Sequence, residues 1–444
     1  MRCPDILVFC LSSLVSGLQP APESVKLLET PGTSGAWRVD TRSEIAGSLK
    51  LPGANGQGKV LAVRGTSAIG YEERNLALDT KGGVERAVRV YHKAEIKRTL
   101  GDQAQESGFR PEARRVVLLR RDTQEVPFSP DSPLTRSEIE LVRTDVFTSA
   151  LAGLLPGREV GIGVSWAAET PAVRELTAMV AIREGGLACK LAEVQAIDGR
   201  KVARVTFQGV VNGSNEDGPC KQELEGFLYF DIARAAIAYI SLRGKHMLSG
   251  PNGQDGGTLD GRFVLTRTPI DPPDNLTDAG LDNARLVPDD DNTLMLEELG
   301  PLRLEYPRRW RIGQARQEQV VLDGADGSGV LVTLTPAGKG PTPAAYLDET
   351  KAWLAKSAAN TGRVDGPREM EPGLSTFSLD ATLKGKPVRM EYFVRTSAEG
   401  CILIAGRLNP GDTGAQADLA RLADRKSTRL NSSHIPLSRM PSSA

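Results

Sequence analysis

The sequence of 444 residues contains few of the side chains that most often carry chemistry, with five cysteines, three histidines and 5% aromatic residues. His92, His246 and His434 do not occur in HExxH, HxH or paired Cys/His spacing, so the sequence has no zinc signature. It also contains no Walker motif, and its glycines do not form a complete dinucleotide-binding pattern. We therefore predict no catalytic residue, no cofactor and no metal, and a protein that is not an enzyme.

A hydrolase is the weakest alternative. Ser165 is followed two residues later by Ala167, whereas the nucleophile elbow has glycine there. As a general base, His92 would need a nucleophile, and the sequence places none nearby. The hydrolase hypothesis would need a pocket that brings His92 or His246 within hydrogen-bond reach of both a serine and a carboxylate.

The last residues of the chain, 424–444, resemble a translated sequencing adapter. Residues 424–434 match a common short-read library adapter codon by codon, and residues 438–444 match the constant stretch after the sample index. We interpret the whole segment as an adapter-derived artefact and leave it out of fold reasoning. We expect it to be disordered, without packed contacts, and we expect the true C-terminus to lie beyond Ala423.

The net charge gives no reason to propose a nucleic-acid partner. The sequence has 55 basic and 56 acidic side chains. The adapter-like tail contributes four basic residues and one acidic residue, so 51 basic and 55 acidic side chains remain, with a net charge of −4. A mildly acidic chain of this kind lacks the electrostatic footprint of a nucleic-acid-binding protein.

The N-terminus has the pattern of a signal peptide over residues 1–21. Arg2 precedes a short apolar run from Ile6 to Leu18, and Ala21 or Gly17 could precede the cleavage site. The run is shorter than the roughly 20 residues that span a bilayer, and no other segment approaches that length. We predict an exported protein, periplasmic or extracellular, with no transmembrane segment after signal removal. The alternative is a buried first strand.

The cysteines that remain after signal removal, Cys189, Cys220 and Cys401, are too few for a disulfide framework. We interpret them as small buried residues. A bridge between Cys189 and Cys220 stays open but is not expected, because next-nearest strands lie about 9.5 Å apart, beyond the usual disulfide range.

Residues 22–268 carry the signals of a β-rich antiparallel domain with one main helix. Trp37 to Leu51 alternates with period two, which is typical of a long half-buried strand. Thr135 and Glu138 form a capping box that begins a helix ending near Gly153. Asp198-Gly199 is a strong hairpin signal. Further strands are expected at Lys59–Val63, Glu73–Leu78, Ala87–Tyr91, Arg115–Arg120, Cys189–Ile197, Glu223–Asp231, Ala236–Arg243 and Thr258–Arg267, and a shorter helix at Ala172–Ile182.

Residues 269–293 are rich in proline and aspartate and predict a linker. Its run of Asp289, Asp290 and Asp291 has oxygen ligands that suit calcium, but no EF-hand glycine or closing glutamate follows, so a solvated acidic linker is the favoured interpretation.

Residues 294–423 predict a smaller second domain. Its first strand ends in Tyr306-Pro307-Arg308-Arg309-Trp310, an aromatic-Pro-x-x-Trp corner. Strands are expected at Gln319–Asp323, Val330–Pro336, Leu374–Thr382, Lys386–Thr396 and Gly400–Asn409, with a helix at Pro343–Lys356 and a last helix cut off by the tail. The corner and this order of elements resemble the PsbP-like α/β sandwich. That resemblance implies a C-terminally truncated binding or assembly module.

The first domain is similar to exported bacterial proteins of unknown function. The similarity lies in the capped helix, the following Leu154-Leu155-Pro156-Gly157, residues 160–166 and the meander of strands. Long antiparallel strands around one helix also resemble the lipoprotein-carrier half-barrels, although this is an analogy of architecture. The fold class that we expect is α+β, with a half-barrel or curved sheet followed by a PsbP-like sandwich.

A basic cluster surrounds the apolar residues 116–119. Arg114, Arg115, Arg120 and Arg121 are candidate partner-binding residues, because they could meet an anionic headgroup or an acidic partner. A solvated face, balanced by Glu112 and Asp122, is the alternative. We expect a non-enzymatic bacterial protein that binds an envelope protein, and the second hypothesis is a carrier of a lipophilic small molecule in the first domain.

Overall fold

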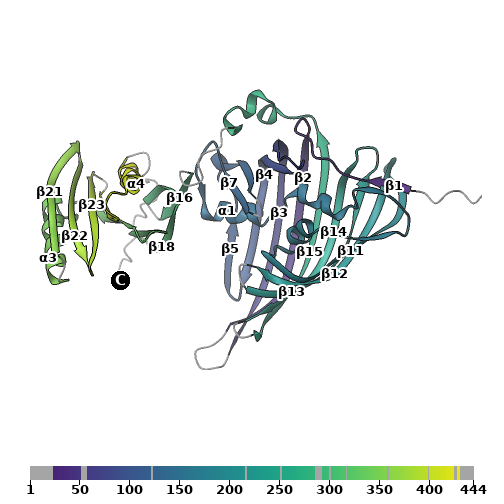
Figure 1. The fold of residues 1–444 in the computed structure, drawn as a ribbon, viewed down its shortest axis with the longest axis horizontal. Coiled ribbons are helices and arrows are strands. Elements are labelled where there is room, and N and C mark those ends of the chain that lie inside the picture. The colour runs from purple at the N-terminus through teal and green to yellow at the C-terminus, as the bar shows by residue number, and fades with distance from the viewer. Residues whose placement is uncertain are drawn as a thin grey trace, which may run out of the picture. The chain divides into compact units, whose positions relative to one another are not determined.

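In the computed structural model (Figure 1), antiparallel strands in open sheets make up most of the protein, with short helices beside them. This arrangement agrees with the α+β class predicted from the sequence. The structure describes residues 24–51, 58–121, 124–215, 218–250, 253–285, 293–299, 302–316, 318–357, 360–398, 400–424 and 428–430. The predicted signal peptide, the acidic run at 289–291 and tail residues 425–427 and 431–444 lie outside this range.

The chain divides into two compact units. The first unit contains Met1–Thr30, Ile45–Leu61 and Phe147–Thr266, and the second contains Pro31–Glu44, Ala62–Val146 and Arg267–Ala444. Strands β2 (Ala36–Leu51) and β3 (Lys59–Leu78) therefore contribute residues to both units.

The first unit is built on an antiparallel meander. Its strands follow the order β10-β11-β12-β13-β14-β15, and the C-terminal part of β2 pairs beside β15. The bounds are β10 Ser165–Ala167, β11 Ala181–Ile197, β12 Arg200–Asn215, β13 Gly218–Asp231, β14 Ala236–Ser249 and β15 Asp255–Ile270. A separate pair joins β1 (Ser24–Leu27) to β9 (Arg158–Gly161). The predicted meander is confirmed, with longer strands than the sequence indicated.

The hairpin predicted at Asp198-Gly199 joins β11 to β12. Both residues have positive φ, 47° and 74°, as a two-residue turn with the twist of the flanking strands requires. Ile197 pairs with Arg200 directly beside the turn. The turn chemistry therefore sets the register of the meander at its first hairpin.

Two glycines allow neighbouring strands of this meander to approach closely. A Cβ on Gly209 in β12 would lie 2.0 Å from the Gly186 carbonyl oxygen of β11. A Cβ on Gly226 in β13 would lie 2.4 Å from the Ser241 carbonyl oxygen and 2.7 Å from Phe207 Cζ. Only glycine fits where a neighbouring backbone or a large side chain comes this near.

The second unit begins with the N-terminal part of β2 and continues in the order β2-β3-β4-β6-β7, with β5 beside β4. The bounds are β4 Val84–Leu100, β5 Gln103–Ser107, β6 Arg115–Arg121 and β7 Gln124–Phe128. A short 3-10 helix, Pro111–Ala113, precedes β6. The two predicted strands at 59–63 and 73–78 are parts of one long β3, which the apolar pattern divided at its glycine-containing middle.

Helix α1 (Arg136–Arg143) begins at the predicted capping box. The Glu138 amide donates to Thr135 Oγ1 at 3.2 Å, and the Thr135 amide donates to Glu138 Oε2 at 2.8 Å. The expectation that this helix continues to Gly153 is wrong, because a 3-10 helix, Thr148–Leu154, follows instead. α1 ends at Arg143, and between the two helices the Val146 carbonyl oxygen accepts a hydrogen bond from Arg89 while the Phe147 amide donates to Glu175.

Helix α2 (Thr170–Thr177) is shorter than the predicted helix at 172–182. Ala178 adopts a left-handed conformation with φ of 51°, which ends the helix, and β11 begins at Ala181. The Thr177 hydroxyl donates to the Val173 carbonyl oxygen at 2.7 Å inside the last turn.

Part of the segment expected to be a linker is packed. Three short 3-10 turns occupy Asp274–Leu276, Ala279–Leu281 and Asn283–Arg285. Leu276, Leu281 and Ala284 are fully buried and join a core with β4, β6 and β7 of the second unit. Arg74 of β3 donates to the Leu276 carbonyl oxygen at 2.7 Å and holds the first turn against the sheet.

The C-terminal part of the second unit contains two sheets. The larger follows the order β18-β19-β20-β24-β23-β22-β21, and the smaller follows β25-β17-β16-β8. The bounds are β8 Leu134–Thr135, β16 Leu294–Leu299, β17 Leu302–Pro307, β18 Trp310–Arg316, β19 Gln319–Gly324, β20 Gly329–Pro336, β21 Asn360–Glu371, β22 Leu374–Leu383, β23 Lys386–Thr396, β24 Gly400–Leu408 and β25 Thr428–Leu430. The sequence analysis missed β16, β18 and β21 as separate strands.

Two apolar cores lie on opposite faces of the seven-stranded sheet. Helix α3 (Pro343–Lys356), which matches its predicted bounds, packs Leu347 and Leu354 against one face. Helix α4 (Thr413–Ala423) and β17 pack against the other, around Trp310. The Trp310 indole N–H donates to Asp418 Oδ2 of α4 at 2.7 Å, so the aromatic-Pro-x-x-Trp corner ties β17 and β18 to this helix.

The expectation that the tail makes no packed contacts is wrong for Thr428–Leu430. These residues form β25, which pairs antiparallel with β17, and Thr428 is 3% exposed. An open strand edge offers unpaired N–H and C=O groups to any extended segment, whatever its side chains. This pairing therefore needs no special sequence in the tail.

Candidate functional site

The candidate site is the face of the first-unit sheet on which α2 lies. The Gln222 side chain of β13 donates to the Thr177 carbonyl oxygen at the end of α2 at 2.6 Å. Gln222 pairs with His246 of β14, and His246 pairs with Leu259 of β15. Directly paired residues share a face of a sheet, so these strands present this row of side chains toward the helix side.

Burial on this helix-side face falls from one end of β14 and β15 to the other. Phe230, Ile240 and Leu265 are 0% exposed. Large apolar side chains further along the same face are only half-buried. They are Leu242, Leu248, Leu259 and Phe263 of β14 and β15, and Ile45 and Leu49 of β2. We call these six residues the apolar row. Ile45 and Leu49 alternate with Trp37 on β2, and Arg267, which alternates with Leu259 and Phe263 on the neighbouring β15, lies over the Trp37 ring.

The structure also contains a buried ionic cluster that the sequence analysis missed. Arg89 of β4 is 0% exposed, and its Nε donates to Glu73 Oε2 of β3 at 2.7 Å. Its Nη1 donates to Asp145 Oδ2 at 3.0 Å, and its Nη2 donates to the Val146 carbonyl oxygen at 3.0 Å. Arg89 thus joins two strands of the second unit to the turn after α1.

Aromatic rings surround this cluster. The guanidinium carbon of Arg89 lies 4.4 Å from the centre of the Tyr71 ring, and the Tyr71 and Tyr91 ring centres are 5.2 Å apart. Burial raises the pKa of Asp145 to about 6, although the Arg89 guanidinium favours its charged form. One buried cation therefore faces two carboxylates, and the pKa of Asp145 is about 6.

A pattern in the sequence could have indicated this cluster. Tyr71 and Glu73 alternate on β3, and Arg89 and Tyr91 alternate on β4, so each pair points to one face of its strand. Charged residues at inward positions of two strands suggest an ion pair, because lone buried charges are costly. The third member, Asp145, lies in the segment that was predicted to be helical, so nothing in the sequence indicated that it faces these strands.

The four candidate arginines lie at the two ends of β6. Arg114 precedes β6 and Arg115 begins it, whereas Arg120 and Arg121 lie at its other end. Arg115 Nε donates to Asp131 Oδ2 at 2.8 Å, and its Nη1 donates to the Gly280 carbonyl oxygen at 2.9 Å. Arg115 therefore has partners within its own unit, whereas Arg114 is exposed.

His92 and His246 belong to β4 and β14. His92 Nε2 lies 3.8 Å from Asp40 Oδ1, and both side chains are about half exposed. His246 belongs to β14, between Gln222 and Leu259 of the neighbouring strands. Ser165 pairs with Lys190 at the start of β10 and is exposed.

The three cysteines that the structure describes are buried thiols, as the sequence analysis favoured. Cys189 pairs with Phe207, and Cys220 pairs with Gly213. Burial raises the pKa of the Cys189 thiol to about 12, so it stays protonated at neutral pH.

The described residues lack two features, a metal-binding group and a membrane-spanning helix. They contain no group of three or more His, Cys, Asp or Glu side chains arranged to hold a metal ion. In the same part of the chain, every helix is too short or too polar to cross a membrane.

No protein-family model matches the sequence, and no curated protein matches it either. Among solved structures, the chain is similar to one described as showing lipid–protein interactions in lipovitellin, with 10% identity over 55% of this chain and 26% of that one and a TM-score of 0.31. It thus spans about a quarter of that lipovitellin chain. It is also similar to the solution structure of cyanobacterial PsbP (CyanoP) from Synechocystis, with 13% identity over 32% of this chain and 95% of that one and a TM-score of 0.24. At these scores neither likeness assigns a function.

Proposed function

We propose that the protein is an exported, non-enzymatic binding or assembly module of the bacterial cell envelope, and that its binding surface is the apolar row. The observation that supports this is the incomplete burial of six large apolar side chains on the helix-side face of the first unit. Contiguous exposed apolar surface commonly marks a site of protein or ligand interaction.

The second unit supports the same proposal through its C-terminal part, which we propose to be a PsbP-like α/β sandwich. Its seven-stranded sheet has α3 on one face and α4 on the other. Domains of that family are mostly binding or assembly modules.

The alternative function is a carrier of a lipophilic small molecule in the first unit. The neighbouring residues of β14 and β15 favour it, because Leu242 pairs directly with Phe263. Such pairs form a continuous apolar strip across neighbouring strands, and apolar side chains with few polar groups are typical of small-molecule sites.

One experiment separates the two functions. The full chain is expressed with its N-terminal segment, purified from the periplasm and extracted with organic solvent for mass spectrometry. Its variants are Leu259→Gln in the apolar row and Thr258→Gln on the adjacent strand position, whose side chain points to the opposite face. A carrier would release a lipid that Leu259→Gln loses and Thr258→Gln keeps.

A binding or assembly module would give no lipid. A photo-crosslinking residue at position 259 would then join a defined partner that the same group at position 258 does not reach. If position 259 yields neither lipid nor partner, the apolar row is not a binding surface. Recovery of the chain with residues 1–21 still attached would contradict export.

A further inference from the structure

The outer side of β17 is a strand edge that accepts an extended segment. β17 pairs with β16 along one side, Leu302 with Leu299 through Pro307 with Leu294. Along its other side, the structure places the three residues of β25, with Leu304 opposite Thr428 and Leu302 opposite Leu430. Among the residues that the structure describes, three residues of β17 pair there, so the contact is a short backbone ladder along this edge.

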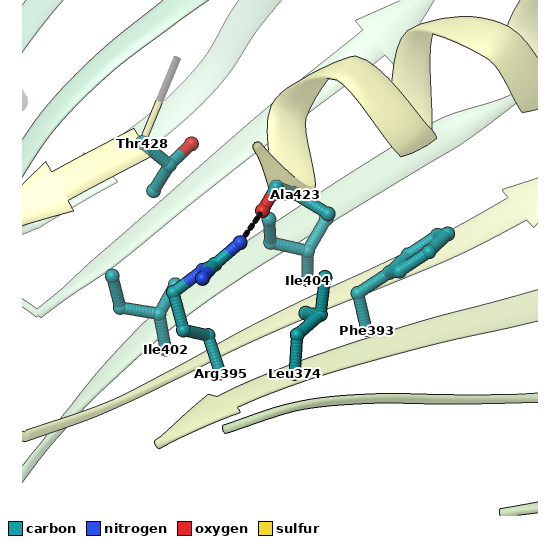
Figure 2. A pocket seen from close by; sticks show the side chains of 7 residues that line it. All are labelled: Leu374, Phe393, Arg395, Ile402, Ile404, Ala423 and Thr428. Carbon is teal, nitrogen blue, oxygen red and sulfur yellow. Dashed lines mark hydrogen bonds between the residues drawn. The ribbon is translucent and has the colours of Figure 1, made fainter. Parts of the chain in front are cut away.

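A small pocket lies beside this ladder (Figure 2). Its apolar walls come from three strands of the seven-stranded sheet, and Ala423 at the end of α4 closes one side. Thr428 of β25 faces into it from the ladder. The walls are Leu374, Phe393, Ile402 and Ile404, with Arg395 as the charged residue among them.

The Arg395 guanidinium is held by two hydrogen bonds, but one of its nitrogen donors lacks an acceptor among the described residues. Its Nη2 donates to the Ala423 carbonyl oxygen at 2.6 Å and to Glu371 Oε1 at 3.0 Å. Its side chain is 11% exposed, and within the described residues its buried Nη1 has no hydrogen-bond partner. An oriented guanidinium with a spare buried donor is suited to a carboxylate.

The present occupant of the pocket does not supply that acceptor. Thr428 Oγ1 is buried and, among the residues described, has no hydrogen-bond partner either. Two unpaired polar atoms therefore line one pocket, and each loses its hydration without compensation. The backbone of β25 fits the edge, but its side chain at position 428 does not fit the pocket.

We propose that the β17 edge and the Arg395 pocket form a docking groove for an extended peptide of a partner protein that presents an acidic side chain opposite Leu304. The peptide adds a strand to β17 through its backbone, and its carboxylate accepts the hydrogen bond that Arg395 Nη1 has to offer. Addition of a strand with one pocket that selects a side chain is an established mode of peptide recognition. This proposal does not depend on the apolar row.

The first test uses the full chain, with its own tail as the occupant. Thr428→Glu supplies a carboxylate, and the matched control Thr428→Gln has the same size without charge. Hydrogen exchange of the β17 and β25 amides reports how firmly the strand is docked. We expect about tenfold stronger protection in Thr428→Glu than in Thr428→Gln, since charged hydrogen bonds are the stronger ones.

The same pair is then compared in an Arg395→Met background, where the difference should disappear. Should Arg395→Met unfold the unit, Arg395→Gln replaces it, because glutamine keeps a polar side chain of intermediate length without the positive charge. Equal protection in Thr428→Glu and Thr428→Gln, or a gain that persists without Arg395, would overturn the proposal.

The second test asks whether the groove takes a peptide from outside. A chain that stops after Asp424 leaves the β17 edge open, and two probes are added, acetylated Ser-Glu-Arg-Leu and Ser-Gln-Arg-Leu amides. We expect the glutamate peptide to bind at least about tenfold more tightly and to protect the β17 amides. Equal binding of the two probes, or pairing of the open edge with a second copy of the chain, would contradict this occupant.

Discussion

The seven-stranded sheet and the sheet of β14 and β15 bury their apolar side chains to different degrees. In the first, neighbouring residues of β24 face opposite cores, Leu403 toward α3 and Ile404 toward α4, and both are buried. In the second, Leu259 and Phe263 are half-buried on the helix-side face. A sheet covered on both faces can bind only through an edge, whereas a partly covered sheet can bind through its face.

The largest loss of stability is expected from the buried ionic cluster of Arg89, Glu73 and Asp145. Replacement Arg89→Met leaves Glu73 and Asp145 buried without their cation, so the free energy of unfolding should fall by about 3–5 kcal/mol. The matched control is Arg38→Met on β2, whose pair with Glu72 has Arg38 53% exposed. That change should cost at most about 1 kcal/mol.

Urea-induced unfolding of both variants measures the difference. If Arg89→Met costs no more than Arg38→Met, the cluster does not hold the turn after α1.

The two sheets can be compared directly with one kind of substitution. Ile404→Ala removes a side chain that is 3% exposed, and it should cost about 2–5 kcal/mol. Leu259→Ala removes a side chain that is only partly buried, so it should cost less, about 1–2 kcal/mol, because part of its apolar surface already meets water. Thermal unfolding of both variants measures the two losses of stability. Equal losses would mean that the apolar row is as well buried as the core.

The pH dependence of stability should come partly from Asp145. Its pKa rises on folding from its ordinary value near 3.8 to about 6, so the folded state holds this proton more tightly. The stabilisation is complete below about pH 4 and is lost as the pH rises through about 6, by up to about 3 kcal/mol.

Asp145→Asn cannot titrate, so its stability should stay flatter than that of the unmodified chain over this range. Urea titrations at pH 4, 5, 6 and 7 measure both proteins. Parallel curves would show that Asp145 does not titrate in this window.

Local signals predicted much of the secondary structure. The alternation of Trp37–Leu51 and the turn at Asp198-Gly199 depend on neighbours in sequence, and both are confirmed. The bounds of α3 also match, because a capping threonine and a proline mark its start. Such elements need no information from distant parts of the chain.

Other elements depended on contacts that the sequence does not display. β21 (Asn360–Glu371) is mostly exposed and pairs with β22 through three register shifts, so it has no regular alternation. α1 ends at Arg143, and just beyond it the Val146 carbonyl oxygen accepts a hydrogen bond from Arg89, which lies 57 residues earlier in the chain. Apolar residues at helical spacing continue past Arg143, but the sequence does not display this contact with a distant buried cation.

The candidate arginines also show that closeness in sequence does not predict closeness in the fold. Closeness in sequence grouped Arg114, Arg115, Arg120 and Arg121, but an extended strand separates its ends by about 3.3 Å per residue. The apolar row, in contrast, joins residues of β2 to residues of β14 and β15 that lie some 200 positions later. Sequence analysis found each strand but could not find which half-buried side chains meet.

The buried thiols can report how often each sheet opens locally. Cys189 and Cys220 belong to the meander, and Cys401 belongs to the seven-stranded sheet. A thiol reagent can reach each of them only when the surrounding strands part, so labelling rates followed by mass spectrometry report the opening of each sheet separately. Without any engineered label, the chain can therefore show whether its partly covered sheet opens more often than its fully covered one.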